Sequence, residues 1–330
     1  MTSFTTPAVE ERWIGSSADP QARLFVRARG PRGAIPLVLV HGFFQPASAI
    51  LDVPGWSLQH TLAASGRRVV LFDLRGYGRS SRPGFMDSPP GQSSPALGCL
   101  ADAVADIEDV VQHVCETEDC AEVDLLGYSW GTARSAAYAL AHPQRVRRLV
   151  LYAPVWCPRN GAAAEAASPG DPTRLDSRLG GYRMFGPGDL SRQWDAEIGP
   201  QDPRVFRDPR VVEAAEQALF ASDAMLGGRS YRAPLGPMLD ALGVSRGRPL
   251  FDAAALRGDV LLVRGDCDRL SVADDAAGLF AQMRTPDRRL VTIAQGTHLL
   301  HLEHARWQLI DEIVGFLGTT RRPVPQAITP

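Results

Sequence analysis

The pentapeptide Gly127-Tyr128-Ser129-Trp130-Gly131 is the clearest indicator of the fold in this sequence. It follows the apolar run 123–126 and precedes the alanine-rich stretch 133–141, so it joins a predicted buried strand to a predicted helix. In that context Gly-x-Ser-x-Gly is a sharp turn that exposes the serine hydroxyl at the top of a sheet. The N–H groups that open the helix favour negative charge nearby. We therefore expect Ser129 to be a nucleophile, although a serine in such a turn can also simply start a helix.

Short apolar segments on either side of this turn alternate with helical patterns. Such alternation is typical of a mostly parallel sheet with helices on both faces. The predicted fold class is α/β, an eight-stranded, mostly parallel sheet flanked by helices and carrying an inserted helical cap. Besides the strand at 123–126, the predicted strands are 12–16, 23–29, 36–40, 68–72, 146–152, 260–263 and 290–294.

The alternation stops after Pro154 and resumes only near residue 256. We expect residues 1–154 and 256–318 to form the core domain and residues 155–255 to be the inserted helical cap. The tail 319–330 contains three prolines and no periodic pattern, so it is expected to be disordered.

The composition narrows the possible functions. Apolar residues make up 45% of the 330-residue chain and the net charge is −2, with no basic stretch, so a nucleic-acid partner is not expected. No apolar run is long enough for a membrane span, and residues 1–12 lack the apolar segment of a signal peptide. A cytoplasmic location follows as an expectation, and a homodimer is left open.

All 35 basic residues are arginine. The absence of lysine from the sequence excludes a Schiff-base lysine, a Walker lysine and a serine–lysine dyad. The five scattered cysteines indicate free thiols, and their spacing suggests no zinc site.

A serine hydroxyl needs a base to accept its proton, and the base needs an acid that orients it. The acid candidates, Asp266 and Asp268, follow the strand at 260–263, and the base candidate His298 follows the strand at 290–294. Functional sites assemble at the carboxyl ends of strands in open α/β sheets. The chain order Ser, Asp, His is the order expected for this architecture.

Five segments together resemble the α/β-hydrolase superfamily, in the branch with a serine nucleophile and a helical cap. They extend over roughly residues 12–318. The segments are His41-Gly42-Phe43-Phe44, Asp73-Leu74-Arg75-Gly76-Tyr77-Gly78-Arg79-Ser80, the pentapeptide at Ser129, Gly265-Asp266-Cys267-Asp268 and Gly296-Thr297-His298.

The resemblance implies a role for each matching residue. Ser129 matches the nucleophile, Asp268 the acid and His298 the base, while the backbone N–H groups of Phe43 and Trp130 match the oxyanion donors. Thr132 departs from the pattern, because similar sequences often have a second glycine there. We expect this threonine to tighten the turn slightly without changing the chemistry.

Several residues have competing interpretations. Asp266 could be the acid in place of Asp268, and His301 and His304 follow His298 closely but are expected at the surface. These histidines do not suggest a metal site, because no acidic or cysteine cluster completes one.

Other polar residues near these motifs are expected to be structural. We expect His41 to orient its loop, Asp73 to pair with Arg75, and Asp106 to lie largely outward on the helix that includes residues 100–114.

The sequence therefore predicts a serine hydrolase that cleaves an ester, lactone, thioester or amide of a small-to-medium apolar substrate, without a cofactor or metal. The same triad could serve an acyltransferase or a cyclase, and a non-catalytic ligand-binding homologue is a third reading. Residues expected to line the substrate pocket are Phe44, Trp156, Met184, Phe185 and Trp194.

Overall fold

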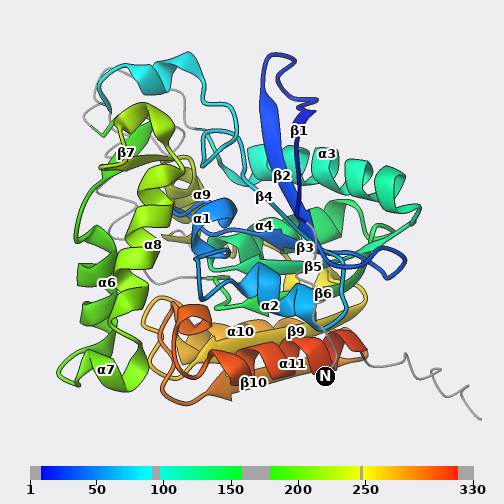
Figure 1. The fold of residues 1–330 in the computed structure, drawn as a ribbon. Coiled ribbons are helices and arrows are strands. Elements are labelled where there is room, and N and C mark those ends of the chain that lie inside the picture. Colours follow the sequence, from blue (N-terminus) through cyan, green and yellow to red (C-terminus); the bar gives the residue numbers. More distant parts are fainter. Residues whose placement is uncertain (1–8, 91–96, 158–178, 246–247, 319–330) are drawn as a thin grey trace, which may run out of the picture.

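The computed structural model describes residues 9–90, 97–157, 179–245 and 248–318. Its centre is an eight-stranded sheet with the order β1-β2-β4-β3-β5-β6-β9-β10 (Figure 1). The strands from β4 to β10 in that order are parallel, whereas β2 is antiparallel to both of its neighbours. The predicted fold class is confirmed. The strands are β1 (Glu10–Gly15), β2 (Arg23–Arg29), β3 (Leu37–Val40), β4 (Val69–Phe72), β5 (Val123–Tyr128), β6 (Val146–Tyr152), β9 (Asp259–Gly265) and β10 (Arg288–Ile293).

The core lies at the middle of this sheet. Every residue of β3, β4 and β5 is buried, as continuous apolar runs predict for strands that are covered on both faces. Figure 1 shows α3 and α4 on one face and α2 and α11 on the other. The helices outside the insertion are α1 (Ala47–Ile50), α2 (Leu58–Ala64), α3 (Leu100–Glu118), α4 (Trp130–Ala141), α10 (Ala273–Gln282) and α11 (Arg306–Gly318).

Helix α3 corrects one expectation about its acidic side chains. Asp106 was expected to lie outward, but it is 1% exposed and shares the inner face of α3 with Ile107 and Val110. Its carboxylate accepts hydrogen bonds from the backbone N–H of Arg75 at 2.9 Å and from Arg75 Nε at 2.5 Å. A buried carboxylate needs such partners, and Arg75 supplies them from the loop after β4.

The expected pair between Asp73 and Arg75 is therefore wrong. Asp73 instead accepts hydrogen bonds from Ser48 N, Ser48 Oγ and Arg79 N, which join the loop after β4 to α1. Sequence proximity suggested the pair, but the two side chains leave the loop toward different elements.

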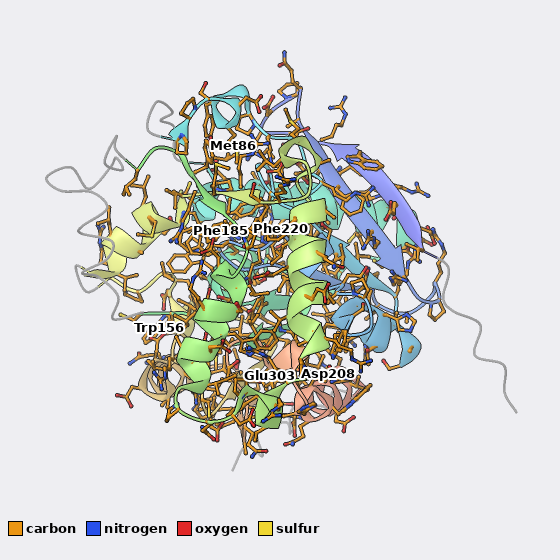
Figure 2. The ribbon with its side chains drawn as sticks, turned by 60° about the vertical axis from the view of Figure 1, so that its left-hand side comes forward. Met86, Trp156, Phe185, Asp208, Phe220 and Glu303 are labelled. Atoms are coloured by element: carbon orange, nitrogen blue, oxygen red, sulfur yellow. The ribbon has the colours of Figure 1, made fainter. Side chains whose placement is uncertain are left out.

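The segment 155–255, called here the inserted segment, is not purely helical. Strands β7 (Tyr182–Phe185) and β8 (Tyr231–Pro234) form a separate antiparallel pair. Phe185 and Phe220 both contact the ring of Tyr231, which connects this pair of strands to α8 (Figure 2). The helices of the inserted segment are α6 (Asp189–Ile198), α7 (Pro203–Phe206), α8 (Arg210–Ala221) and α9 (Pro237–Ser245).

Three further predictions concern the C-terminal tail, the cysteines and membrane spans. The tail 319–330 lies outside the described residues. All five cysteines are free thiols. Among the described helices, none combines the length and apolar character that crossing a bilayer requires.

Candidate active site

The turn between β5 and α4 holds Ser129 in a strained backbone conformation. Its φ is 57° and its ψ is −125°, a region that residues with side chains rarely occupy. Close approach explains the neighbouring glycines: a Cβ on Gly127 would lie 2.3 Å from the carbonyl oxygen of Gly131, and one on Gly131 would lie 2.2 Å from that of Val40. The strain is thus fixed by tight packing of β5, β3 and α4, and it leaves Ser129 half-buried.

Thr132 reinforces this turn. Its Oγ1 donates to the carbonyl oxygen of Ser129 at 2.6 Å and accepts from the N–H of Val155 at 3.0 Å. The hydroxyl, absent from a glycine, therefore links the turn to the chain that leaves β6.

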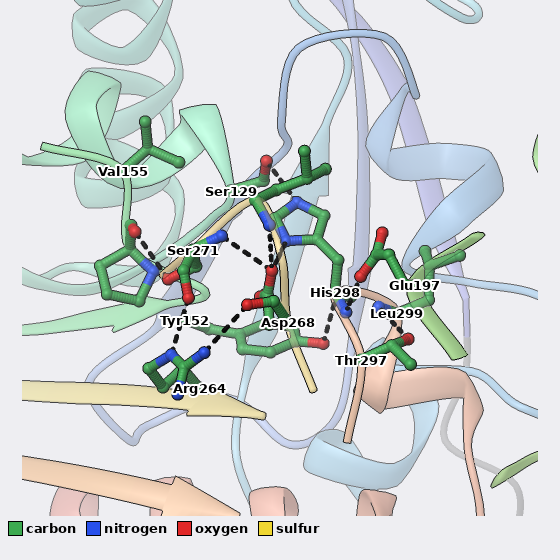
Figure 3. Close-up of polar contacts among 12 residues, drawn as sticks. Ser129, Tyr152, Val155, Glu197, Arg264, Asp268, Ser271, Thr297, His298 and Leu299 are labelled. Atoms are coloured by element: carbon green, nitrogen blue, oxygen red, sulfur yellow. Dashed lines mark hydrogen bonds and ion pairs between the residues drawn. The ribbon is translucent and has the colours of Figure 1, made fainter. Parts of the chain in front are cut away.

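Three side chains from distant parts of the sequence meet beside this turn (Figure 3). Ser129 Oγ lies 2.7 Å from His298 Nε2, and His298 Nδ1 lies 2.9 Å from Asp268 Oδ2 and 3.0 Å from Asp268 Oδ1. His298 and Asp268 are each 3% exposed. This arrangement can transfer a proton from the hydroxyl to the imidazole while the carboxylate holds Nδ1–H.

The structure distinguishes between the two candidate acids. Asp268 Oδ1 also accepts from the N–H groups of Leu270 and Ser271, at 2.9 Å and 2.7 Å, which fixes its carboxylate toward His298. Asp266 is exposed, and its carboxylate accepts from the N–H of Gly296 at 3.3 Å. Asp266 therefore lies near the loop of His298 without contacting the imidazole.

A second carboxyl group lies against the histidine. Glu197, from α6 of the inserted segment, is 5% exposed and accepts the backbone N–H of His298 through Oε2 at 2.8 Å. Within the described residues its other oxygen, Oε1, is buried without a hydrogen-bond partner. Sequence reasoning missed Glu197, because nothing in the local pattern of α6 indicates which loop the helix meets.

These carboxyl groups set the protonation behaviour of the site. Burial alone would lower the pKa of His298, but the charge and hydrogen bond of Asp268, with a contribution from Glu197, raise it above its usual value. Burial raises the pKa of Glu197 to about 7, against the opposing effect of His298. Both shifts bear on whether His298 is neutral, which is the form that can act as a general base.

The two histidines that follow His298 differ from each other. His304 is exposed, as predicted. His301 was expected at the surface but is 1% exposed, with Nδ1 3.0 Å from Tyr152 Oη and Nε2 3.0 Å from the carbonyl oxygen of Ile50. Burial lowers the pKa of His301 to about 3, so the ring is neutral. A 3₁₀ turn at Leu300–Leu302 directs it inward, which helical spacing does not predict.

A cavity of about 310 Å³ opens at Ser129. Its lining includes Phe44, as predicted, but not Trp156, Met184, Phe185 or Trp194. Apart from His298, the described residues around it carry no acidic or basic side chain other than the phenol of Tyr128. They are Gly42, Phe43, Phe44, Gln45, Tyr128, Ser129, Trp130, Val155, Gln193, Met238, Ala241 and Leu270.

The four other predicted lining residues have different positions. Trp156 donates its indole N–H to Phe251 O at 2.9 Å, and Met184 is 47% exposed. Phe185 does not line the cavity but contacts the ring of Phe44, with ring centroids 4.8 Å apart. Trp194 is fully buried and donates its N–H to Glu303 Oε1 at 2.7 Å. Aromatic residues in the inserted segment mostly build its own packing, because burying them stabilises the segment.

Phe43 and Trp130, the predicted oxyanion donors, both line the cavity beside Ser129. Their ring centroids are 5.8 Å apart. In the part of the chain that the structure describes, no group of three or more His, Cys, Asp or Glu residues is placed to hold a metal ion.

A second, larger cavity of about 680 Å³ lies elsewhere and contains none of these residues. Its arginines are already engaged: Arg27 and Arg29 pair with Asp52, and Arg79 pairs with Glu11. Of these two cavities, the smaller one is therefore the one that Ser129 and His298 line.

Comparisons with known proteins agree with this architecture. The sequence profile of the family described as "alpha/beta hydrolase fold" matches residues 35–305. A structure of a thermophilic esterase from Thermogutta terrifontis superposes with a TM-score of 0.61 at 20% identity, covering 94% of this chain and 100% of the esterase. At that identity the likeness concerns the fold.

Curated relatives match only part of the chain. A Sus scrofa protein named "1-acylglycerol-3-phosphate O-acyltransferase ABHD5" is 32% identical over 196 residues, 54% of this chain and 49% of the relative. A Mus musculus "(Lyso)-N-acylphosphatidylethanolamine lipase" is 35% identical over 119 residues, 36% of this chain and 30% of the lipase. The match thus spans about half or less of the length of these relatives.

Proposed function

We propose that this chain, which belongs to the α/β-hydrolase fold family, is a serine hydrolase that cleaves a neutral ester, thioester, lactone or amide. The observation that carries the proposal is the 2.7 Å contact between Ser129 Oγ and His298 Nε2, continued by Asp268 at Nδ1. A serine aligned in this way gains a proton acceptor, which is what its hydroxyl lacks near neutral pH.

The proposed reaction proceeds in two halves. His298 Nε2 takes the proton of Ser129 as Oγ attacks the substrate carbonyl, and the backbone N–H groups of Phe43 and Trp130 receive the charge that develops on the carbonyl oxygen. His298 then gives the proton to the leaving group, which leaves an acyl group on Ser129. Water, deprotonated by His298, attacks this ester and releases the acid and the free hydroxyl.

The cavity limits the substrate. Its lining offers apolar and aromatic surface, with Gln45 and Gln193 as neutral polar groups. Among the described lining residues only His298 could act as a cationic partner for an anionic group inside it. Its 310 Å³ corresponds to the liquid volume of about ten waters. We therefore propose a small-to-medium neutral acyl group and a small-molecule substrate.

We propose that the inserted segment, residues 155–255, acts as a cap over a core domain formed by residues 1–154 and 256–318. Gln193 of α6 and Met238 of α9 line the cavity, which supports a cap that shapes the acyl site. The cytoplasmic location and the homodimer left open by the sequence stay predictions.

A fluorophosphonate probe tests the nucleophile. The wild-type protein should form a covalent adduct, Ser129→Ala should form none, and Ser135→Ala, a change at another buried serine of α4, should label as the wild type does. Undiminished labelling of the Ser129→Ala variant contradicts the proposal. A protein that binds an apolar ligand but never labels would support the non-catalytic reading.

Acyl transfer is a second candidate, favoured by the printed name of the relative that matches 54% of this chain. An alcohol or amine, from a second molecule or the substrate itself, would then replace water at the acyl-enzyme. Product analysis with a neutral ester and added glycerol separates the two: free acid as the sole product supports hydrolysis, and a glycerol ester or cyclised product supports transfer or cyclisation.

A further inference from the structure

A buried arginine, Arg134, contacts Gly42 of the cavity lining and is not explained by the proposed triad. Arg134, on α4 one turn beyond Ser129, is 0% exposed. Its Nη1 donates to the carbonyl oxygens of Gly42 at 2.7 Å and His41 at 3.1 Å. Its Nη2 donates to Tyr77 Oη at 3.3 Å and to the carbonyl oxygen of Gly98 at 3.1 Å.

This charge is costly to bury. Among the described residues, no carboxylate lies within ion-pair distance of Arg134, and its Nε is buried without a hydrogen-bond partner. Asp240, on α9, interacts with its charge only at longer range. By contrast, the buried Arg232 pairs with Asp223, and the buried Arg68 pairs with Glu118. Burying a cation without an ion-pair partner lowers stability, so the contacts that Arg134 does form need an explanation.

The shortest contact of Arg134 goes to a peptide group that His41 also holds. The carbonyl of Gly42 accepts from Arg134 and also lies 2.9 Å from His41 Nδ1. His41 Nε2 accepts the N–H of Leu74 at 3.2 Å, so Nδ1 carries the proton and donates to Gly42. Burial lowers the pKa of His41 well below its usual value, which agrees with a neutral ring.

This peptide group also carries the N–H of Phe43. Because the peptide bond is trans, the N–H points opposite to the carbonyl that Arg134 and His41 hold. Within the described residues, the Phe43 N–H has no protein acceptor. We infer that Arg134, with His41, is a positioning residue that locks the Gly42–Phe43 peptide so that its N–H is ready to receive the oxyanion of the reaction proposed above.

The inference rests on the proposed function and adds an electrostatic element to it. A carbonyl that accepts a hydrogen bond from a cation polarises its own peptide, which strengthens the donor at the other end. The positive charge of Arg134 also favours negative charge that develops on the far side of the peptide. Donors held in place before the reaction need no reorganisation when the charge forms.

The test compares Arg134→Met and Arg134→Lys with the wild type, using p-nitrophenyl butyrate as substrate. Loss of a direct oxyanion donor costs about 100- to 1000-fold in kcat, so loss of its support should cost about 10- to 100-fold, with KM little changed. Arg134→Lys keeps the charge and should recover part of the rate. n-Butylboronic acid, which forms a tetrahedral anion on serine, should lose affinity by the same factor as kcat.

Two control variants separate positioning from stability. Tyr77→Phe removes a different partner of Arg134 and leaves the bonds to Gly42, so its kcat should stay close to that of the wild type. Arg148→Met removes another buried arginine, which pairs with Asp259 away from the cavity, and should lower the melting temperature without lowering kcat. If Arg134→Met fails to fold, the kcat and boronate affinity of Arg134→Lys are compared with those of the wild type instead.

The outcomes distinguish this inference from the proposal on which it rests. An active wild type whose Arg134 variants keep kcat and boronate affinity within threefold overturns the role of Arg134 and leaves the hydrolase proposal intact. A rate loss that Arg148→Met reproduces at equal loss of stability also overturns it. A wild type inert to ester, boronate and fluorophosphonate overturns both.

Discussion

At the residue scale, Glu197 adds to the effect of Asp268 on the electrostatics of the proposed catalytic base. It holds the backbone N–H of His298 at 2.8 Å while its carboxyl group contributes negative charge beside the imidazole. The proposed reaction needs the neutral form of His298, so activity should rise with pH as the imidazole loses its proton. The raised pKa of His298 places that rise above the range of an ordinary histidine.

Replacing Glu197 with glutamine should move this rise to lower pH. Glutamine keeps an oxygen for the N–H of His298 but removes the charge that helps to raise the pKa of the imidazole. The measurement is the pH profile of kcat/KM for p-nitrophenyl butyrate. The exposed Glu213→Gln on α8 is the control and should leave the profile unchanged. An acid limb that stays in place or moves upward contradicts the assigned influence of Glu197.

At the scale of elements, helix α6 is attached to the loop that carries His298. Glu197 is one attachment, and the second is Trp194, whose Nε1 donates to Glu303 Oε1 at 2.7 Å. Glu303 also accepts from Thr297 N at 2.9 Å and from Thr297 Oγ1 at 2.6 Å. The histidine loop is therefore held by carboxyl groups on two sides, one of them supplied by the inserted segment.

Removing the second attachment should lower both stability and activity. Trp194→Phe keeps most of the buried ring but deletes a hydrogen bond to a buried carboxyl group, which should lower the free energy of unfolding by about 2 kcal/mol. The kcat should also fall, since Glu303 positions Thr297 next to His298. Urea unfolding and ester hydrolysis measure the two effects. The control is Trp307→Phe, at a tryptophan that is 53% exposed, and should change neither. Equal effects of the two changes would show that α6 does not support the loop.

The elements themselves were largely predictable, because their signals are local. Apolar runs identified the six strands from β3 to β10 of the main sheet, and the polar turn at 17–20 indicated the pair β1 and β2. The elbow, Asp268 and His298 could be found from motifs that follow strand ends. Contacts between elements that are distant in sequence could not be predicted. Asp106 meets Arg75, and Glu197 meets His298, through packing that no local period encodes. The strands β7 and β8 are far apart in sequence, so their pairing and register could not be predicted either.

At the scale of the whole molecule, buried neutral histidines link folding to pH. His41 and His301 are both enclosed, and burial lowers the pKa of each below that of an unfolded histidine. Such a group contributes stability above its unfolded pKa and loses it as the pH falls, because the unfolded chain takes up the proton first. For His301 the loss should begin near pH 6.5 and continue to about 3.

His301→Gln should weaken this dependence. Glutamine can still donate and accept hydrogen bonds but does not titrate, so the slope of unfolding free energy between pH 6 and 4 should decrease by up to about 1.4 kcal/mol per pH unit. Urea titrations at several pH values measure the slope. His304→Gln, at an exposed histidine, serves as the control and should leave it unchanged. An unaltered slope in the His301 variant contradicts its neutral buried state.

The most direct measurement for the molecule as a catalyst is the location of the acyl group. The wild type is mixed with p-nitrophenyl butyrate, quenched with acid within its first turnover, digested and mapped by mass spectrometry. We expect a butyryl group on the peptide that contains Ser129 and none in His298→Ala over the same interval. A butyryl group on another residue, or one on Ser129 at the same rate without His298, would contradict the account.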